Sequence, residues 1–257
     1  MDIVSLRSGS RGNAALIFSD KTKILVDCGV SGKVIEEALS SLDISPRDLD
    51  GIVVTHEHSD HISGIGVMMR RYKLPVWANE DTWFAMEGQI GKIDSNLEKI
   101  HNGEFEIGDI GIKSFNISHD AAAPIGYSFQ KGEEKVSVAT DIGILKKDIF
   151  EVVKKSKTVL LEANHDVNML EIGRYPEHLK RRIRGDFGHL SNDDAGKAAE
   201  FLVRLGTENI ILGHLSEENN YPNLAEKTVE LALAEAEIIV GRDVNLSVAS
   251  QYDICRI

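Results

Sequence analysis

The chain has 257 residues, of which 42% are hydrophobic and 27% are charged, and its formal net charge is −12 at pH 7. These proportions are typical of a globular protein with a buried core, and they argue against disordered and fibrous chains. The acidic balance argues against a protein that holds nucleic acid mainly through a basic surface, although a local positive site is compatible with it.

The sequence lacks several features that would point to a membrane, to secretion or to a nucleotide cofactor. No apolar run approaches the roughly 18 residues that a membrane helix needs, and the first residues, MDIVSLRSGSRG, lack the basic and apolar regions that predict a signal peptide. The two cysteines, Cys28 and Cys255, cannot form a disulfide framework, so a reducing cytoplasm is expected. The Gly9–Gly12 loop does not match a dinucleotide fingerprint, so no nucleotide cofactor is expected. With no repeat or linker, residues 1–257 are predicted to form one domain, and the oligomeric state stays open.

The first half of the chain alternates short strands with helices. Apolar runs separated by Ser, Gly, Asn and Asp predict strands at Ile3–Leu6, Ala14–Phe18, Lys23–Val26, Gly51–Thr55 and Pro75–Trp77. Helical spacing of apolar residues predicts helices at Val34–Leu39, Ile62–Arg70 and Glu80–Met86.

The second half begins with a β-rich stretch and then alternates again. The predicted strands are Gly111–Ile117, Ile125–Gln130, Lys135–Ala139, Thr158–Leu161 and Asn209–Leu212, with a hairpin turn at Lys131–Gly132 and β-like segments near Ile238–Val240 and Leu246–Val248. The predicted helices are Ile149–Lys155, Asp193–Leu205 with Ser191 as N-cap, and Leu224–Glu235. Two batches of strands, each interleaved with helices, favour an α/β fold with four αββα layers. A doubly wound parallel sheet is the alternative.

The strongest functional signal is Thr55-His56-Glu57-His58-Ser59-Asp60-His61, directly after a predicted strand. His56 and His58 are two positions apart, so in extended backbone they point to the same side and can share a metal. Asp60 and His61 follow where the chain turns toward a helix, and they can serve a second metal a few ångströms away. Three histidines and an aspartate at this spacing are rare in an ordinary polar loop.

Three further candidate ligands stand alone in the sequence. Each follows an apolar run that predicts a strand: His119, Asp141 and His214. A single polar residue at such a place is usually structural, but three of them in a chain with this motif predict a shared metal site. Imidazole suits Zn²⁺ and Mn²⁺, and carboxylate suits harder ions such as Mn²⁺.

With these residues the chain resembles the metallo-β-lactamase superfamily, over roughly residues 1 to 220. The resemblance implies a four-layer αββα sandwich that holds two divalent ions, Zn²⁺ or Mn²⁺. It implies that one ion is bound by His56, His58 and His119, the other by Asp60, His61 and His214, and that Asp141 bridges them. A metal-bridging hydroxide is then the expected nucleophile, and Asp60 is a catalytic candidate that could orient it.

Two later segments are similar to loops of ribonuclease Z. Leu160–Asp166 contains Glu162 and His165, and His189 lies just before the predicted helix at Asp193–Leu205. By this resemblance His189 contacts the scissile phosphate and assists the leaving oxygen, with Glu162 as its supporting carboxylate. A histidine just before a helix N-terminus is well placed to hold a phosphate. His165 is a further candidate for substrate contact or an ordinary structural histidine.

A narrower resemblance covers several short motifs in order. Ser8–Asn13, the HEHSDH motif, Glu162–Asp166, Gly188–Asn192 and His214–Ser216 are similar to the WalJ/YycJ-like bacterial family. That family is associated with DNA exonuclease activity that runs 5′ to 3′. Arg11 stands where the family pattern has a serine.

A cluster of basic residues lies between the Glu162 and His189 segments. It consists of Arg174, Lys180, Arg181, Arg182 and Arg184. The cluster could guide a nucleic-acid backbone toward the metals, with Arg181 and Arg182 binding phosphates, or it could be a solvated helix face.

The sequence thus predicts a two-metal phosphodiesterase, specifically an exonuclease that acts on single-stranded or 5′-ended DNA. A small-molecule hydrolase of the same fold, which cleaves a thioester, lactone or cyclic phosphodiester, is the first alternative and agrees better with the net charge of −12. A non-catalytic metal-binding partner is the second alternative.

Overall fold

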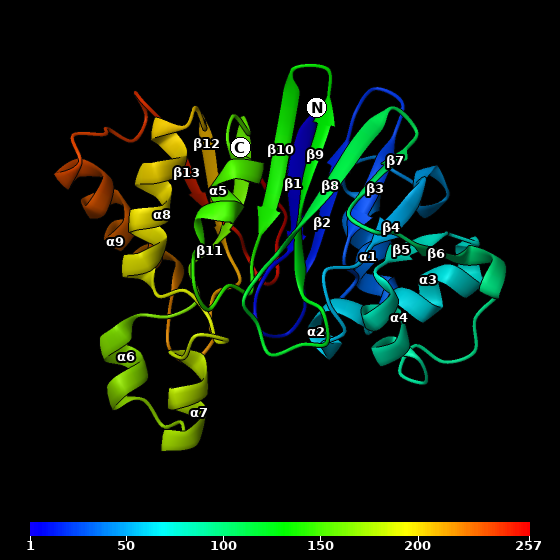
Figure 1. Ribbon diagram of the computed structural model, residues 1–257, viewed down its shortest axis with the longest axis horizontal. Helices are drawn as coiled ribbons and strands as arrows, with labels where there is room; N and C mark the ends of the chain where they lie inside the picture. Colours follow the sequence, from blue (N-terminus) through cyan, green and yellow to red (C-terminus); the bar gives the residue numbers. More distant parts are fainter.

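The computed structural model describes residues 1–257 as two seven-stranded sheets that lie face to face, with helices on both outer faces (Figure 1). In the first sheet the strand order is β14-β1-β2-β3-β4-β5-β6. Its strands are β1 (Asp2–Arg7), β2 (Ala14–Phe18), β3 (Lys23–Val26), β4 (Gly51–Val53), β5 (Val76–Ala78), β6 (Glu98–Ile100) and β14 (Cys255–Arg256).

The second sheet has the order β13-β12-β11-β10-β9-β8-β7. Its strands are β7 (Glu104–Ile107), β8 (Ile110–Asn116), β9 (Ile125–Lys131), β10 (Glu134–Ala139), β11 (Thr158–Glu162), β12 (Asn209–Gly213) and β13 (Asn245–Val248). Strands β10 to β13 run parallel to one another, whereas β7, β8 and β9 form antiparallel pairs.

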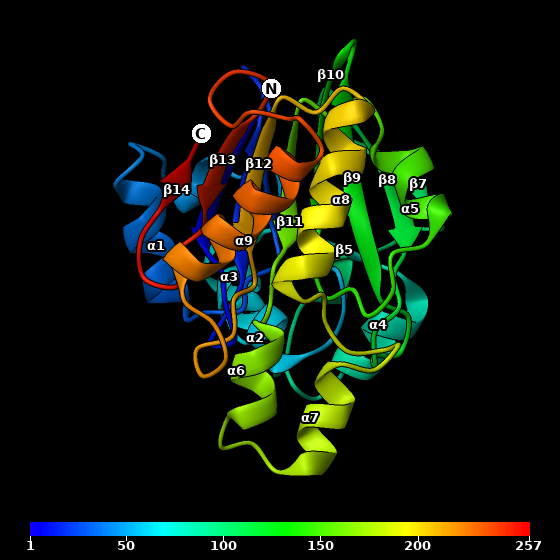
Figure 2. The same cartoon turned by 90° about the vertical axis from the view of Figure 1, so that its left-hand side faces the viewer.

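The helices complete the outer layers. They are α1 (Gly32–Ser40), α2 (Ser59–Ile62), α3 (Ile65–Tyr72), α4 (Glu80–Met86), α5 (Lys147–Val153), α6 (Val167–Ile172), α7 (Glu177–Ile183), α8 (Asn192–Arg204) and α9 (Pro222–Glu235), with single 3₁₀ turns at Pro46–Asp48 and Ser95–Leu97. Helices α1, α3 and α4 lie on one side of the sheets, and α8 and α9 cover the other (Figures 1 and 2). None of the helices has the length and apolar character that a bilayer-spanning segment needs.

Three apolar layers hold this arrangement together. The middle layer fills the space between the sheets with side chains such as Ile17, Val53, Tyr127 and Ile211. The other two lie between each sheet and its helices. Burying apolar area on both faces of each sheet is the main stabilising term in such a fold. The four-layer αββα prediction is confirmed, and the doubly wound single sheet is wrong.

The helix predicted at Ile62–Arg70 is present as α3, but its predicted start is wrong, because Ile62 ends the separate helix α2. Gly64 lies between α2 and α3, and its N–H donates to the Cys28 carbonyl at 2.8 Å. A Cβ at Gly64 would lie 2.3 Å from the Val30 carbonyl oxygen. This close approach to the loop after β3 bends the chain and separates the two helices.

Other differences concern short or polar elements. Strand β6 is exposed along its length and carries two charged residues, so it has no apolar pattern. Helices α6 and α7 have six and seven residues, too few for a clear period. The segment predicted near 238–240 is no strand and contributes only a bridge between Val240 and Val244. The strand predicted at 75–77 is shifted by one residue, to β5.

The strand directions bring the functional segments together. Strands β3 and β4 are parallel, and so are β10, β11 and β12. The carboxyl ends of parallel strands meet at one edge of a sheet, where ligands bind in α/β proteins. The polar residues that follow or end these strands are Asp27, His56, Asp141, Glu162 and His214.

Candidate metal centre

Three of the strand-end residues adopt an unusual backbone conformation. Asp27, Asp141 and His214 have φ angles of 59°, 61° and 55°, in the left-handed region. A non-glycine residue there typically costs on the order of 1–3 kcal/mol and is retained where the surrounding structure holds it. All three side chains are buried at the same edge of the sheets, which suggests that the conformation serves the site.

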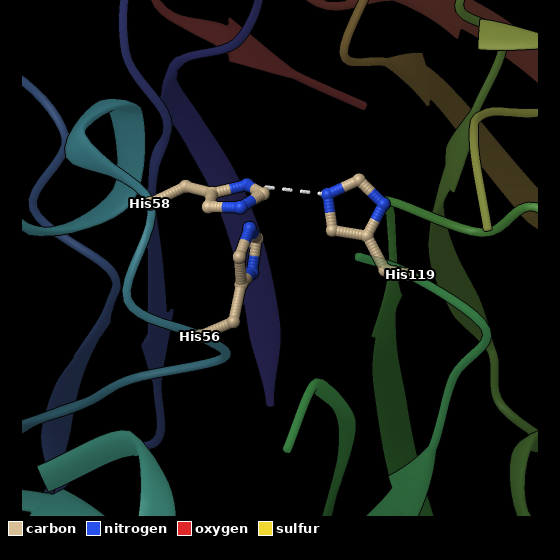
Figure 3. Close-up of side chains that lie close together, drawn as sticks. All are labelled: His56, His58 and His119. Carbon is tan, nitrogen blue, oxygen red and sulfur yellow. Dashed lines mark hydrogen bonds between the residues drawn. The ribbon is translucent and has the colours of Figure 1, made fainter. Parts of the chain in front are cut away.

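A first group of donor atoms comes from His56, His58 and His119 (Figure 3). One nitrogen of each ring lies within 4.8 Å of the others. Nδ1 of His58 and Nε2 of His119 are 3.3 Å apart. Nε2 of His56 is buried and has no hydrogen-bond partner. A buried nitrogen without a partner is costly, unless a cation takes its lone pair.

A second group consists of Asp60, His61 and His214. Oδ2 of Asp60 lies 3.5 Å from Nε2 of His61 and 3.5 Å from Nε2 of His214. Asp141 lies between the two groups, because its oxygens are 3.5 Å from Nε2 of His61 and 3.8 Å from Nε2 of His119. Oδ2 of Asp141 is also buried without a partner.

The second nitrogen of every histidine in these groups is bonded away from the centre. The partners are Thr55 Oγ1 for His56 at 3.0 Å, the Asp120 carbonyl for His58 at 3.2 Å, Asp27 Oδ2 for His61 at 2.8 Å, the Gly188 carbonyl for His119 at 3.2 Å, and Glu162 Oε1 for His214 at 2.9 Å. Outer hydrogen bonds of this kind fix the tautomer and orientation of metal-ligating histidines. The donor set therefore fits divalent cations.

Glu162 connects two of the predicted functional histidines. Its Oε1 accepts from Nδ1 of His189 at 2.7 Å and from Nδ1 of His214 at 2.9 Å. Its Oε2 accepts from the backbone N–H groups of Ile142 and Leu190 at 2.7 and 3.1 Å. The carboxylate is fully buried, and these bonds keep its pKa below the usual range although burial by itself would raise it.

The loop before β2 reaches the same centre from the first sheet. Nδ2 of Asn13 donates to Oδ2 of Asp60 at 3.3 Å, while its Oδ1 accepts from the Gly9 N–H at 3.0 Å. The Ser8 hydroxyl accepts from the His214 N–H at 2.8 Å. The Ser8–Asn13 loop thus contacts two residues of the second group, one from each half of the chain.

The charges of the centre depend strongly on one another. Burial favours neutral groups, but Asp141, Asp27 and Asp60 raise the pKa of His61 well above its ordinary value. The pKa of His214 rises to about 10 against the effect of burial, mainly because of Asp141. Burial and the neighbouring His61 lower the pKa of His56. Carboxylates and imidazoles in such contact form a site that accepts positive charge in its centre.

A model of the beta-lactamase superfamily domain matches residues 22–215. The chain belongs to this superfamily. The exodeoxyribonuclease YycJ of Bacillus anthracis is 44% identical over 238 residues, which are 92% of this chain and 90% of that protein. The exodeoxyribonuclease WalJ of Streptococcus pneumoniae serotype 2 is 45% identical over 242 residues, or 93% of this chain and 90% of that protein. The expected membership of a WalJ/YycJ-like family is confirmed.

The fold is also that of solved superfamily structures. The metallo-β-lactamase fold protein YhfI from Bacillus subtilis aligns over 100% of both chains with a TM-score of 0.70 and 15% identity. Together with the His and Asp clusters, this fold indicates that the present superfamily member binds divalent metal.

Most of the predicted site residues converge in the superfamily fold. The seven predicted metal ligands lie in the two groups and at Asp141 between them, and their role as ligands stays a prediction. A cavity of about 200 Å³ opens onto His58, Asp60, His119, Asp141 and His214. His189 also lines it. Glu162 does not line it and contacts His189 and His214 instead, so its predicted catalytic role stays a prediction.

Two predicted substrate contacts lie apart from this cavity. His165 is 2% exposed and is not among the lining residues. Arg181 is exposed on α7 and its nearest acidic partner is Glu177, at 4.0 Å. Direct contact of either with a phosphate in the cavity is not supported by their positions.

The predicted basic cluster is largely neutralised by acidic neighbours. Arg184 pairs with Glu171 at 2.6 Å and with Glu177 at 2.8 Å. Arg182 forms a two-point pair with Asp120, in which one of the two hydrogen bonds is 2.9 Å long. Only Arg182 of the cluster lines the cavity. The cluster therefore does not form a continuous basic track.

Asp27 and Asn13 are functional candidates that the sequence reasoning left out. Asp27 follows β3 in the same way as Asp141 follows β10, so the rule that found Asp141 could have found it too. Asn13 was part of a recognised motif, but nothing in the sequence indicates that it contacts Asp60.

Proposed function

We propose that the chain is a metal-dependent exodeoxyribonuclease that shortens DNA from its 5′ end. The observation that carries the proposal is the pair of donor groups with its outward-bonded histidines, at the edge of a fold shared with relatives named exodeoxyribonucleases. Identity of 44–45% over more than nine tenths of the chain supports the transfer of this activity. DNA as the substrate agrees with the cytoplasmic location predicted from cysteine usage, which stays a prediction.

Two divalent ions, Zn²⁺ or Mn²⁺, are proposed as cofactors. His56, His58 and His119 would hold one ion, Asp60, His61 and His214 the other, and Asp141 would contact both. When bound, such ions acidify water and neutralise the charge of a phosphodiester. The two orphaned buried atoms, Nε2 of His56 and Oδ2 of Asp141, support this assignment.

The protein groups around the ions orient the substrate and handle a proton. His189 is held by Glu162 through Nδ1, so its other nitrogen is free to contact a phosphate in the cavity that it lines. A water oxygen attacks phosphorus and gives up a proton to the surrounding water, the bond to the leaving oxygen breaks, and that oxygen takes a proton from the free nitrogen of His189. Asp60 orients the attacking water, and Arg182 attracts a phosphate at the rim.

End-labelled DNA tests the proposal. Metal-stripped protein is reloaded with Mn²⁺ or Zn²⁺ and incubated with single- and double-stranded DNA that carries the label at either end. Stepwise shortening is expected, with immediate loss of a 5′ label as a mononucleotide, and Asp60→Ala treated in the same way should be inactive. No cleavage of any DNA by protein that holds two ions would contradict the proposal.

A small-molecule hydrolase of the same fold is the alternative. The paired arginines and the net charge of −12 favour it, because they offer little attraction to a long polyanion. Turnover of a thioester, a lactone or a cyclic nucleotide without turnover of DNA would decide for it. The complete set of donor groups argues against a non-catalytic metal-binding protein.

A further inference from the structure

Helices α6 and α7 form a hairpin that stands out from the two sheets. Both project at the end of the molecule where α2, which carries Asp60 and His61, also lies (Figures 1 and 2). The hairpin leaves the second sheet after β11 and returns just before His189. It therefore borders the cavity from the side, between two segments that belong to the candidate metal centre.

The side that the hairpin turns to the cavity is mostly apolar. Tyr175, Leu179 and Ile183 line the cavity next to the metal-ligating residues. Leu179 and Ile183 are four residues apart on α7 and share one face of that helix, while Tyr175 lies in the turn just before it. Tyr175 and Leu179 are half-buried, and Ile183 is 8% exposed. A cavity with charged donors at one end and an apolar wall beside them fits a ligand that is anionic at one end and flat and apolar at the other.

Ion pairs fix this wall relative to the donor groups. Arg182 binds the carboxylate of Asp120 with both arms of its guanidinium. Asp120 follows His119, and its backbone carbonyl accepts from Nε2 of His58 at 3.2 Å. The wall is thus tied to the loop that positions two histidines of the first group. Since Arg181 and Arg184 also face acidic side chains, the side of the hairpin at the cavity offers an apolar surface more than a cationic one.

We propose that α7 and Tyr175, two residues before it, form a nucleobase subsite. The base of a nucleotide next to the scissile phosphate packs on Tyr175 and Leu179, while its phosphate lies among the donor groups. This inference rests on the proposed function and adds the part of the substrate that the hairpin recognises. Every base has a flat face for stacking, so the subsite senses the presence of a base and not its identity.

Abasic substrates test the subsite. The holoenzyme is given end-labelled DNA with a tetrahydrofuran abasic unit on one or the other side of the first scissile bond, and normal DNA of the same length. Wild type should cleave normal DNA faster than at least one abasic form by about 5- to 150-fold in kcat/KM, the range expected for stacking one base on an aromatic ring. Tyr175→Ala should lose this preference and Tyr175→Phe should retain it.

Further variants and two small inhibitors test whether the preference arises at this wall. Leu179→Ala removes the second apolar contact and should reduce the preference for normal over abasic DNA. His178→Ala, an exposed change on the same helix, should leave that preference unchanged. Thymidine 5′-phosphate should inhibit wild type more strongly than deoxyribose 5-phosphate does. The two compounds should inhibit Tyr175→Ala to the same extent.

The outcomes separate the two proposals. Equal cleavage of normal and both abasic DNAs by wild type overturns the subsite alone, and so does a full base preference that survives in folded Tyr175→Ala and Leu179→Ala. No cleavage of any DNA by wild type overturns the proposed function and the subsite with it.

Discussion

The donor groups and the α6–α7 hairpin border one cavity but are built in opposite ways. His56, His61, Asp141 and His214 are at most 3% exposed, and their outer hydrogen bonds lead to further buried groups. The hairpin has a largely exposed surface, including Ile172 at 85% exposure, and is held by ion pairs near water.

This difference in burial indicates where amino-acid substitutions are tolerated. Breaking the buried hydrogen bonds that orient the donor groups leaves further unpaired polar groups and is expensive. Exposed ion pairs typically contribute only about 0–1 kcal/mol each. Substitutions among the donor groups should therefore abolish turnover, whereas substitutions in the hairpin should alter substrate preference and leave the fold intact.

Outside the donor groups themselves, the largest effect is expected from Glu162→Gln. Glutamine has one oxygen, which can accept from only one of the two pairs of donors, the imidazole N–H groups or the backbone N–H groups. Its NH₂ group then faces the other pair and cannot accept from it, which disturbs the positions of His189 and His214. Loss of such an outer bond typically costs about 10- to 100-fold in metal affinity or activity. Competition with a chelator measures the affinity, and Glu133→Gln, an exposed change, is the control. Unchanged metal retention and activity would show that the Glu162 hydrogen bonds are not needed.

Asn13→Ala should have the next largest effect. It removes the donor to Oδ2 of Asp60 and the acceptor for the Gly9 N–H. We expect about a 10-fold lower kcat with little change in KM, since the substrate does not contact Asn13. Asn96→Ala, at an exposed asparagine far along the chain, is the control. A rise in KM alone would contradict a role in positioning Asp60.

Arg182→Ala should act mainly on substrate binding. The change removes the pair with Asp120 and one positive charge at the cavity. We expect a KM for DNA that is raised by less than about 10-fold, with a melting temperature close to that of wild type, because the pair is partly exposed. Steady-state kinetics and thermal unfolding provide both values. A loss of kcat comparable with that of Glu162→Gln would place Arg182 in the chemistry itself.

The smallest effect concerns pH and lies away from the cavity. His101 lies against Tyr127, whose hydroxyl donates to the Val54 carbonyl just before the HEHSDH motif. Burial lowers the pKa of His101 to about 4, from an ordinary value of 6.5. The unfolded chain therefore binds more protons than the folded one between these values, and stability falls as the pH drops from about 6.5 toward 4.

Denaturant unfolding of wild type and His101→Gln over this range measures the His101 contribution. The difference in stability between the two proteins should shrink as the pH falls. A difference that is independent of pH would show that His101 does not titrate in this way.

Part of the candidate site was predictable because its signals are local. His56, His58, Asp60 and His61 lie within six positions of one another, so strand and turn geometry alone brings them together. His119, Asp141 and His214 could be found because each follows an apolar strand. The start of the helix predicted at Ile62–Arg70 was wrong because a contact from a distant loop, at Cys28 and Val30, requires Gly64 and a bend.

The sequence by itself determined the layered fold and the candidate ligands, since apolar periodicity and dense polar motifs are properties of short segments. Its resemblance to ribonuclease Z loops made Glu162 and His189 candidates as well. Only the tertiary structure decided that Glu162 supports two histidines, that Asn13 holds Asp60, and that Arg182 and not Arg181 borders the cavity. These contacts join residues that are distant in the chain. Their geometry follows from the register of two sheets and the placement of one hairpin, which no local pattern contains.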